Sequence, residues 1–198
     1  DRLARVQAAM EAHAAALPPQ YAAPCAGAPW DVTLAIGDIA YDDATDWELS
    51  NHFFGGSLRS VLGGAPVAPA LGNHEAHTAD VYAFSGPYFE AFDLPPTGHR
   101  GPPGNAAYYS FPMGGVHFSV LETARRAPRG DGEMMAWLRN DTADADAHPL
   151  GAPKWKVALM HHPPFTRGSH HSDSEWDLEQ IQDRLVPELE RLRVGPGP

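Results

Sequence analysis

Residues 155–165, WKVALMHHPPF, decide the fold of this chain. A short apolar run ends in two adjacent histidines, His161 and His162, and the two prolines that follow stop any regular structure from continuing. An apolar run between such breakers is typical of a buried strand, often one in a parallel sheet. Because open α/β sheets bind ligands at the carboxyl ends of their strands, the histidines fall where a functional site is expected.

Two other segments repeat this design. Residues 30–36, WDVTLAI, run into 37–41, GDIAY, and residues 66–71, PVAPAL, run into 72–75, GNHE. Three predicted strands therefore each deliver an oxygen or imidazole donor at the same kind of strand exit. This convergence, more than any single residue, indicates a functional site.

Length and composition predict one domain over residues 1–198. The chain is 43% hydrophobic and 20% charged, which fits a globular protein with a proper core. No apolar run approaches the ~20 residues of a membrane span, so no membrane contact is expected. The chain opens on Asp1-Arg2-Leu3, without Met or an apolar signal region, which is typical of a processed or truncated end. A single cysteine, Cys25, excludes an intrachain disulfide.

The net charge of −11 argues against a nucleic-acid backbone as partner, because that partner favours a basic surface. An acidic protein can still act on anionic substrates if bound cations supply the local field. The 11 histidines would offset most of the charge if they were protonated in mild acid. The sequence gives no sign of the oligomeric state.

Helical spacing and turn residues predict the other elements. They are a helix capped by Asp1 and ended by Pro18-Pro19, a helix over 47–62 weakened by Gly55-Gly56, an irregular surface segment 77–105 pinned by its aromatic rings, a hairpin of 107–111 with 116–121, a helix over 131–145, and a last helix capped by Asp173 and kinked at Pro187. Strands alternating with helices, plus a hairpin, predict an α/β layered sandwich.

Three motifs occur in an order and spacing that resemble the calcineurin-like metallophosphoesterases. They are Gly37-Asp38-Ile39-Ala40-Tyr41, Gly72-Asn73-His74-Glu75 and Val157-Ala158-Leu159-Met160-His161. Within that superfamily the chain resembles the purple acid phosphatases, whose signature is Gly-Asp-x-x-Tyr. The likeness extends to the strand 109–111 and to His170 and His171, nine and ten residues past His161. The resemblance implies a layered α/β/β/α sandwich.

The resemblance also implies a dinuclear metal centre, with Fe(III) beside Zn(II), Mn(II) or Fe(II). Asp38 would bridge the two cations, since a carboxylate offers two oxygens. Tyr41 would bind iron as phenolate, which needs a highly charged cation because a free phenol has a pKa of ~10. Asn73 and His161 would supply an amide oxygen and an imidazole nitrogen to the divalent ion.

Each of these residues also has an ordinary structural reading when it is taken alone. Asp38 could cap a helix, Tyr41 could be a half-buried ring beside a turn, Asn73 could be a turn residue, and His161 could be a satisfied core histidine. The Gly-Asp-x-x-Tyr spacing favours the metal reading. The structural role is assigned instead to His162, because the resembled motif has its ligand at the first histidine.

Three further histidines, His74, His170 and His171, resemble the family's outer residues, which hold phosphate oxygens and protonate the leaving alkoxide. An imidazolium near pH 5–6 suits that proton transfer. We expect His171 to be the proton donor, whereas His170 fits equally well as a solvated loop residue. Glu75 and His77 are expected to support the loop.

The implied function is hydrolysis of phosphate monoesters by a water or hydroxide activated at the dinuclear centre. A calcineurin-like phosphodiesterase is one alternative, and a non-catalytic domain that has lost its metals is another. The resemblance also implies a secreted or periplasmic location.

Two family motifs are absent from the sequence. No Asp-x-Gly segment precedes Asp38, and Gly195-Pro196-Gly197-Pro198 stands where the family has Gly-His-x-His. The sandwich is therefore expected to be incomplete, truncated at both ends, with an exposed sheet edge. The divalent site keeps Asp38, Asn73 and His161, but the iron site keeps only Asp38 and Tyr41. We accordingly expect this chain to bind metal weakly and to hydrolyse little.

Overall fold

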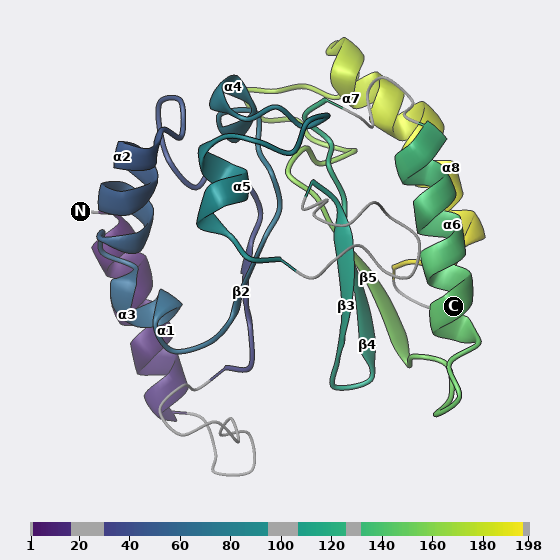
Figure 1. Cartoon of the computed structure of the whole chain (residues 1–198), viewed down its shortest axis with the longest axis horizontal. Coiled ribbons are helices and arrows are strands. Elements are labelled where there is room, and N and C mark those ends of the chain that lie inside the picture. Colours follow the sequence, from purple (N-terminus) through teal and green to yellow (C-terminus); the bar gives the residue numbers. More distant parts are fainter. Residues whose placement is uncertain (1, 17–29, 95–106, 126–131, 196–198) are drawn as a thin grey trace.

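The computed structural model describes residues 2–16, 30–94, 107–125 and 132–195. Two small sheets lie in the middle of the molecule (Figure 1). In the first, β1 (Thr33–Ala35) pairs in parallel with β2 (Val67–Pro69). In the second, β4 (Val116–Val120) lies between antiparallel β3 (Tyr109–Met113) and parallel β5 (Trp155–Leu159). All three apolar runs and the hairpin predicted from the sequence form strands.

Helices cover the outer sides of both sheets (Figure 1). On the side of β1 and β2 they are α1 (Arg2–Ala16), α2 (Asp46–Glu48), the π-helical turn η2 (Leu49–Phe54), α3 (Arg59–Leu62), α4 (Glu75–Thr78) and α5 (Pro87–Ala91). On the side of β3–β5 they are α6 (Gly132–Asp146), α7 (Trp176–Gln180), the π-helical turn η3 (Ile181–Leu185) and α8 (Val186–Arg191). The arrangement confirms the predicted α/β sandwich.

The two sheets pack against each other through a small apolar cluster. It joins Ala70, just after β2, to Tyr109, Val120 and Leu159 of the second sheet. The hydroxyls of Tyr88 and Tyr109 both donate to the carbonyl of Pro69, at 3.0 and 2.9 Å. The carboxyl end of β2 is therefore held against the second sheet, which brings the strand exits of the two sheets together.

A buried polar network joins the second sheet to α6. His117 Nε2 lies 2.7 Å from Asp141 Oδ2, and Ser110 Oγ donates to Asp141 Oδ1 at 2.5 Å. Both partners of the His117–Asp141 pair are buried. Apolar side chains of α6, η3 and the end of β4 surround the sheet on the same side, including Leu121, Met134, Leu138, Ile181 and Leu185.

Several helix predictions need correction. The last helix begins at Trp176 with Glu175 as its N-cap residue, not with Asp173, because the Asp173 carboxylate accepts from Arg167. Pro187 lies just after the π-helical turn η3, inside a helical run that continues from Trp176 to Arg191, and the predicted kink there stays a prediction. The weak point at Gly55-Gly56 is confirmed, since the helical run ends at Phe54 and resumes at Arg59. The caps expected at Asp1 and Pro18-Pro19 lie outside the described residues.

The segment after His77 is not irregular throughout. It contains α5, and Tyr88 and Phe92 are buried in a cluster with Phe53 and Leu71. Part of this segment is therefore core, because its aromatic rings pack against the outer face of the first sheet. Residues 95–105, the rest of the predicted irregular segment, lie outside the described part.

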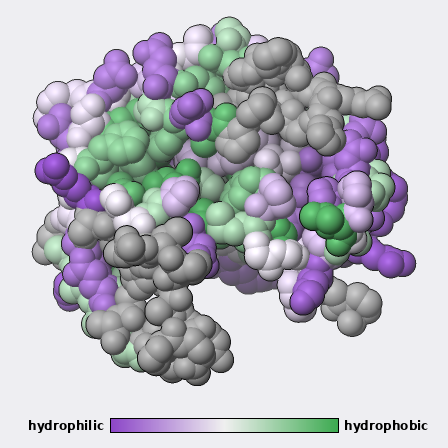
Figure 2. Space-filling view, turned by 60° about the horizontal axis from the view of Figure 1, so that its bottom comes forward, coloured by the Kyte–Doolittle hydropathy of each residue, from purple (hydrophilic) through white to green (hydrophobic). Residues whose placement is uncertain are grey.

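Among the described elements β4 alone has a strand on both sides, so β1, β2, β3 and β5 are all edge strands. Within the described ranges, the outer side of β5 pairs with Gly195 through an isolated bridge to Lys156. Leu34 and Ile36 in and after β1 are exposed, as is Trp155 at the start of β5. On the face shown in Figure 2, hydrophobic residues gather beside hydrophilic ones. Within the described ranges, no helix has both the length and the apolar character that a membrane crossing requires.

Candidate metal site

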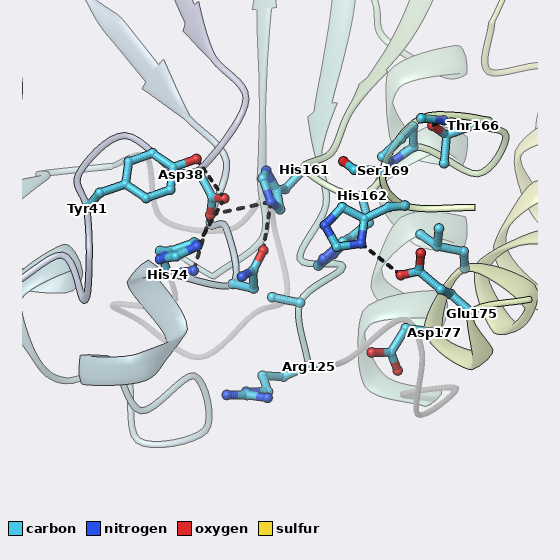
Figure 3. A pocket seen from close by; sticks show the side chains of 16 residues that line it. Asp38, Tyr41, His74, Arg125, His161, His162, Thr166, Ser169, Glu175 and Asp177 are labelled. Carbon is cyan, nitrogen blue, oxygen red and sulfur yellow. Dashed lines mark hydrogen bonds and ion pairs between the residues drawn. The ribbon is translucent and has the colours of Figure 1, made fainter. Parts of the chain in front are cut away.

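The exits of β1, β2 and β5 meet at one point (Figure 3). His161 Nε2 lies 3.0 Å from Asn73 Oδ1 and 3.4 Å from Asp38 Oδ1. The hydroxyl of Tyr41 donates to the other carboxylate oxygen, Asp38 Oδ2, at 3.1 Å. The four residues predicted as metal ligands therefore lie together, although they come from three separate segments of the chain.

Glu75 holds the two donor loops in place. Its carboxylate is fully buried and accepts the backbone N–H groups of Asp38 and Ile39 at 2.8 and 2.9 Å and that of Gly72 at 2.9 Å. A buried carboxylate is stable when several donors satisfy it in this way. The supporting role expected for Glu75 is thus visible as one residue that ties the β1 exit to the β2 exit.

The glycines that open both motifs are needed for this close approach. Gly37 has φ +83°, and a Cβ there would lie 2.6 Å from His161 Nδ1. A Cβ on Gly72 would lie 2.3 Å from the backbone nitrogen of Asp38 and 2.4 Å from Asp38 Oδ1. Any side chain at either position would therefore push the donor atoms apart.

The environment of His161 favours a cation. His161 Nδ1 lies 2.9 Å from the carbonyl oxygen of Ile36, which can only accept, so Nδ1 carries the proton. In the neutral ring the lone pair of Nε2 then faces the oxygens of Asn73 and Asp38. Three lone-pair donors that face one another repel unless a positive charge lies between them. This donor set suits a metal ion with mixed nitrogen and oxygen ligands.

The described donor set is small. In the part of the chain that the structure describes, no three His, Cys, Asp or Glu side chains form a group that could hold a metal ion. Of these residue types the cluster has Asp38 and His161, and its other donors are the Asn73 amide and the Tyr41 phenol.

Tyr41 and His74 both lie against Asp38. Burial raises the pKa of the half-exposed Tyr41 phenol, and its hydrogen bond to Asp38 raises the pKa further. The hydrogen bond from His74 Nδ1 to the Asp42 carbonyl raises the pKa of His74, and the charge of Asp38 acts in the same direction. The backbone N–H of His74 also donates to Asp38 Oδ1 at 3.1 Å. The Asp38 carboxylate thus accepts hydrogen bonds from Tyr41 and from the backbone of His74.

The His170-His171 pair is divided by the structure. We call Asp38, Tyr41, Asn73 and His161 together the donor cluster. A cavity of about 590 Å³ opens beside it, and His74 and His170 line this cavity. His170 Nδ1 lies 2.9 Å from Glu175 Oε2. The ring of His171 is absent from the described wall of this cavity and lies beside Arg167 and the N–H of Asp173. His77 is paired with Asp43 at 2.9 Å, so it supports the loop after β1.

Other residues also form this wall, among them His162, to which the sequence assigns a structural role. His162 lines the cavity, with its backbone N–H donating to Thr123 Oγ1 and its ring Nδ1 lying 3.2 Å from the Thr123 carbonyl oxygen. Burial, followed by the charge of His161, lowers the pKa of His162. Arg125, Glu175 and Asp177 also line the cavity. Arg125 comes shortly after the end of β4. The expectation that functional side chains lie at strand exits therefore applies to it as well.

Comparisons with known proteins identify the family of this chain. The family model described as calcineurin-like phosphoesterase matches residues 2–189. Over 140 residues the chain is 29% identical to Purple acid phosphatase 23 of Arabidopsis thaliana, covering 70% of this chain and 28% of that protein. Over 181 residues it is 26% identical to Probable inactive purple acid phosphatase 9 of the same plant, covering 80% and 26%.

A solved structure shares the fold. It is the purple acid phosphatase PPD1 from yellow lupin (Lupinus luteus) seeds, with a TM-score of 0.60 and 18% identity over 83% of this chain and 29% of that one. The chain thus spans between a quarter and a third of the length of these relatives. Because the family model matches residues 2–189 of this chain, the chain belongs to the calcineurin-like phosphoesterases and is purple acid phosphatase-like.

Proposed function

We propose that this chain carries part of the site of a metal-dependent hydrolase that acts on phosphate monoesters. The observation that supports this most directly is the meeting of Asp38, Asn73 and His161, with His161 Nε2 facing two oxygens at 3.0 and 3.4 Å. Family membership supports phosphate esters as the substrate class. The proposed location, secreted or periplasmic, follows the resemblance alone.

The donors fit a divalent position better than a ferric one. Asp38, Asn73 and His161 offer a carboxylate, an amide and an imidazole, a set that suits Zn(II), Mn(II) or Fe(II). A ferric position in a dinuclear centre would have only Asp38 and Tyr41 from the described residues, and we derive no step from it. A bound divalent ion would lower the pKa of a water molecule and offset the charge of the phosphoryl oxygens.

The histidines of the cavity wall would act on the ester itself. His74 lies beside Asp38 and can donate to a phosphoryl oxygen. His170 has its Nδ1 directed to Glu175, which leaves Nε2 to present a proton to the leaving alkoxide. Glu175 also accepts the backbone N–H of His171 at 2.6 Å, so one carboxylate orients this loop. We therefore favour His170 over His171 as the proton donor.

Metal content and turnover of p-nitrophenyl phosphate test the proposal together. We expect the purified chain to take up about one zinc or manganese ion weakly and to hydrolyse the ester slowly. Asp38→Asn should abolish both properties, because it removes the charge at the centre of the donor set. The exposed Asp144→Asn, on α6, is the matched control and should change neither. Turnover that survives Asp38→Asn would refute the assignment.

A non-catalytic role is the second candidate. One relative is described as a probable inactive purple acid phosphatase, and the described residues offer a ferric position only Asp38 and Tyr41. Metal uptake without any turnover would favour this role. Faster hydrolysis of bis(p-nitrophenyl) phosphate than of the monoester would instead favour a phosphodiesterase.

A further inference from the structure

The cavity extends well beyond the donor cluster. Its volume of about 590 Å³ exceeds what a phosphate group needs and falls in the usual range for a small organic ligand. Asp38, Asn73 and His161 form one part of its wall, whereas Arg125 lies apart from them on the exit of β4 (Figure 3). A phosphate held at the donor cluster would therefore leave space beside Arg125 for the rest of the ester.

Arg125 brings a positive charge to this wall. Its side chain is half-buried, and no carboxylate of the described residues forms an ion pair with its guanidinium. Of the acidic groups on the same wall, Glu175 is engaged by His170 and by the His171 N–H, and Asp177 is exposed to solvent. A guanidinium that has no carboxylate partner among the described residues is a receptor for a planar anion, above all a carboxylate.

The turn that carries Arg125 is fixed on both sides. The backbone N–H of Arg125 donates at 2.7 Å to Oε1 of Glu122, which is fully buried. The neighbouring Thr123, also fully buried, accepts the backbone N–H of His162 at 3.0 Å. The base of Arg125 is therefore connected through two hydrogen-bonded steps to the loop of His161. Such preorganisation lowers the entropic cost of binding.

We propose that Arg125 forms a subsite for a carboxylate on the leaving group, so that the preferred substrates are phosphate esters of carboxylated alcohols or phenols. This inference rests on the proposed function for the position of the phosphate. The phosphoryl group would lie at the donor cluster, and the carboxylate of the same molecule would bind the guanidinium.

Two non-hydrolysable ligands test the subsite without requiring turnover. We would titrate the zinc-supplemented protein with phenylphosphonate and with 4-carboxyphenylphosphonate and compare the dissociation constants by calorimetry. The carboxylated ligand should bind about tenfold more tightly, as expected for one charge-assisted contact. Arg125→Gln should reduce this ratio to about one while leaving the affinity for phenylphosphonate nearly unchanged.

Arg59→Gln is the matched control, since Arg59 is exposed on α3 and its loss changes the net charge equally. This variant should keep the tenfold ratio. If Arg125→Gln lost the same factor of affinity for both ligands, the proposal would be overturned, because Arg125 would then bind the phosphonate group itself. A ratio near one in the unmodified protein, or no binding of the carboxylated ligand, would also overturn it. Failure of the proposed function is seen separately, as absence of p-nitrophenyl phosphate turnover.

Discussion

Glu75 Oε2 accepts the backbone N–H of Asp38 at 2.8 Å, across 37 positions of the chain. The same carboxylate accepts from Gly72 and Ile39, so a single buried charge sets the separation of the β1 and β2 exits. The donor cluster thus depends on a residue that does not belong to it.

Glu75→Gln should therefore loosen the site without removing a donor atom. The carboxamide has only one accepting oxygen, so its NH₂ group would face a backbone N–H. We expect a loss of about 2–3 kcal/mol in the free energy of unfolding and a drop of about 10–100-fold in metal affinity. Urea unfolding and a metal titration measure the two effects. The exposed Glu90→Gln on α5 should change neither quantity, and a metal affinity equal to that of the unmodified protein would contradict this role of Glu75.

Gly72→Ala tests the contact between the two strand exits. The added Cβ would lie 2.3 Å from the Asp38 nitrogen, and the backbone cannot give way cheaply. Overpacking of this kind costs about 1–3 kcal/mol, and it would also displace the Asp38 carboxylate.

The control for this substitution is Gly132→Ala. A Cβ on Gly132, the first residue of α6, would meet no atom within 4 Å, and alanine favours the helix. The variant should be neutral or slightly stabilising in urea unfolding. Equal stability of the two alanine variants would mean that the strand exits are not held as closely as the geometry indicates.

The buried pair of His117 and Asp141 should matter for stability rather than for chemistry. Asp141→Ala would leave the ring of His117 and the hydroxyl of Ser110 without their partner inside the protein. Removal of one member of a buried pair costs about 3–5 kcal/mol. Thermal unfolding should show this loss, while Asp144→Ala on the exposed side of the same helix should change stability by less than about 0.5 kcal/mol. A small effect of Asp141→Ala would show that water replaces the lost carboxylate.

Acid should weaken the contact between α6 and α8. Hydrogen bonds from Arg139, and then from Arg191, lower the pKa of Glu188 below its usual value. A carboxylate with a lowered folded-state pKa adds stability above its unfolded pKa, and this contribution is lost as the pH falls through the folded value. The advantage of the unmodified protein over Glu188→Gln should therefore be present at pH 7 and shrink below about pH 4. Because Arg139 is half exposed, we expect less than about 1 kcal/mol, measured as urea midpoints across pH. A gap between the two midpoints that is independent of pH would exclude an ionic origin.

The strands and their donor residues are local features, which is why the sequence predicts them. Short apolar runs that end in Gly-Asp or Gly-Asn mark the exits, and the resemblance to a family fixes their order. The choice between His170 and His171 is different, because their spacings to His161 differ by only one residue and the loop geometry separates them. Glu175 orients that loop. It lies next to the predicted start of the last helix, where an acidic residue is common, so the sequence does not single it out.

Tertiary contacts explain the other differences from the sequence analysis. Tyr88 and Phe92 become core because Phe53 and Leu71 lie across from them, a fact that no local periodicity contains. Arg125 follows a strand exit like the predicted ligands, but an isolated arginine at the end of a hairpin strand is usually solvated. Its place on the cavity wall depends on how the second sheet meets the first.

The division between His170 and His171 leads to the last prediction. If His170 Nε2 protonates the leaving alkoxide, His170→Asn should slow a poor leaving group more than a good one, because a good one departs without a proton. We expect kcat for phenyl phosphate to fall at least about tenfold further than kcat for p-nitrophenyl phosphate, out of the ~10²–10⁴ that general acid help supplies. His171→Asn should lower the two rates by the same small factor, since its ring contacts Arg167 and Asp173 instead of the cavity. A larger leaving-group effect in His171→Asn would return the role of proton donor to His171 and would require its loop to rearrange when substrate binds.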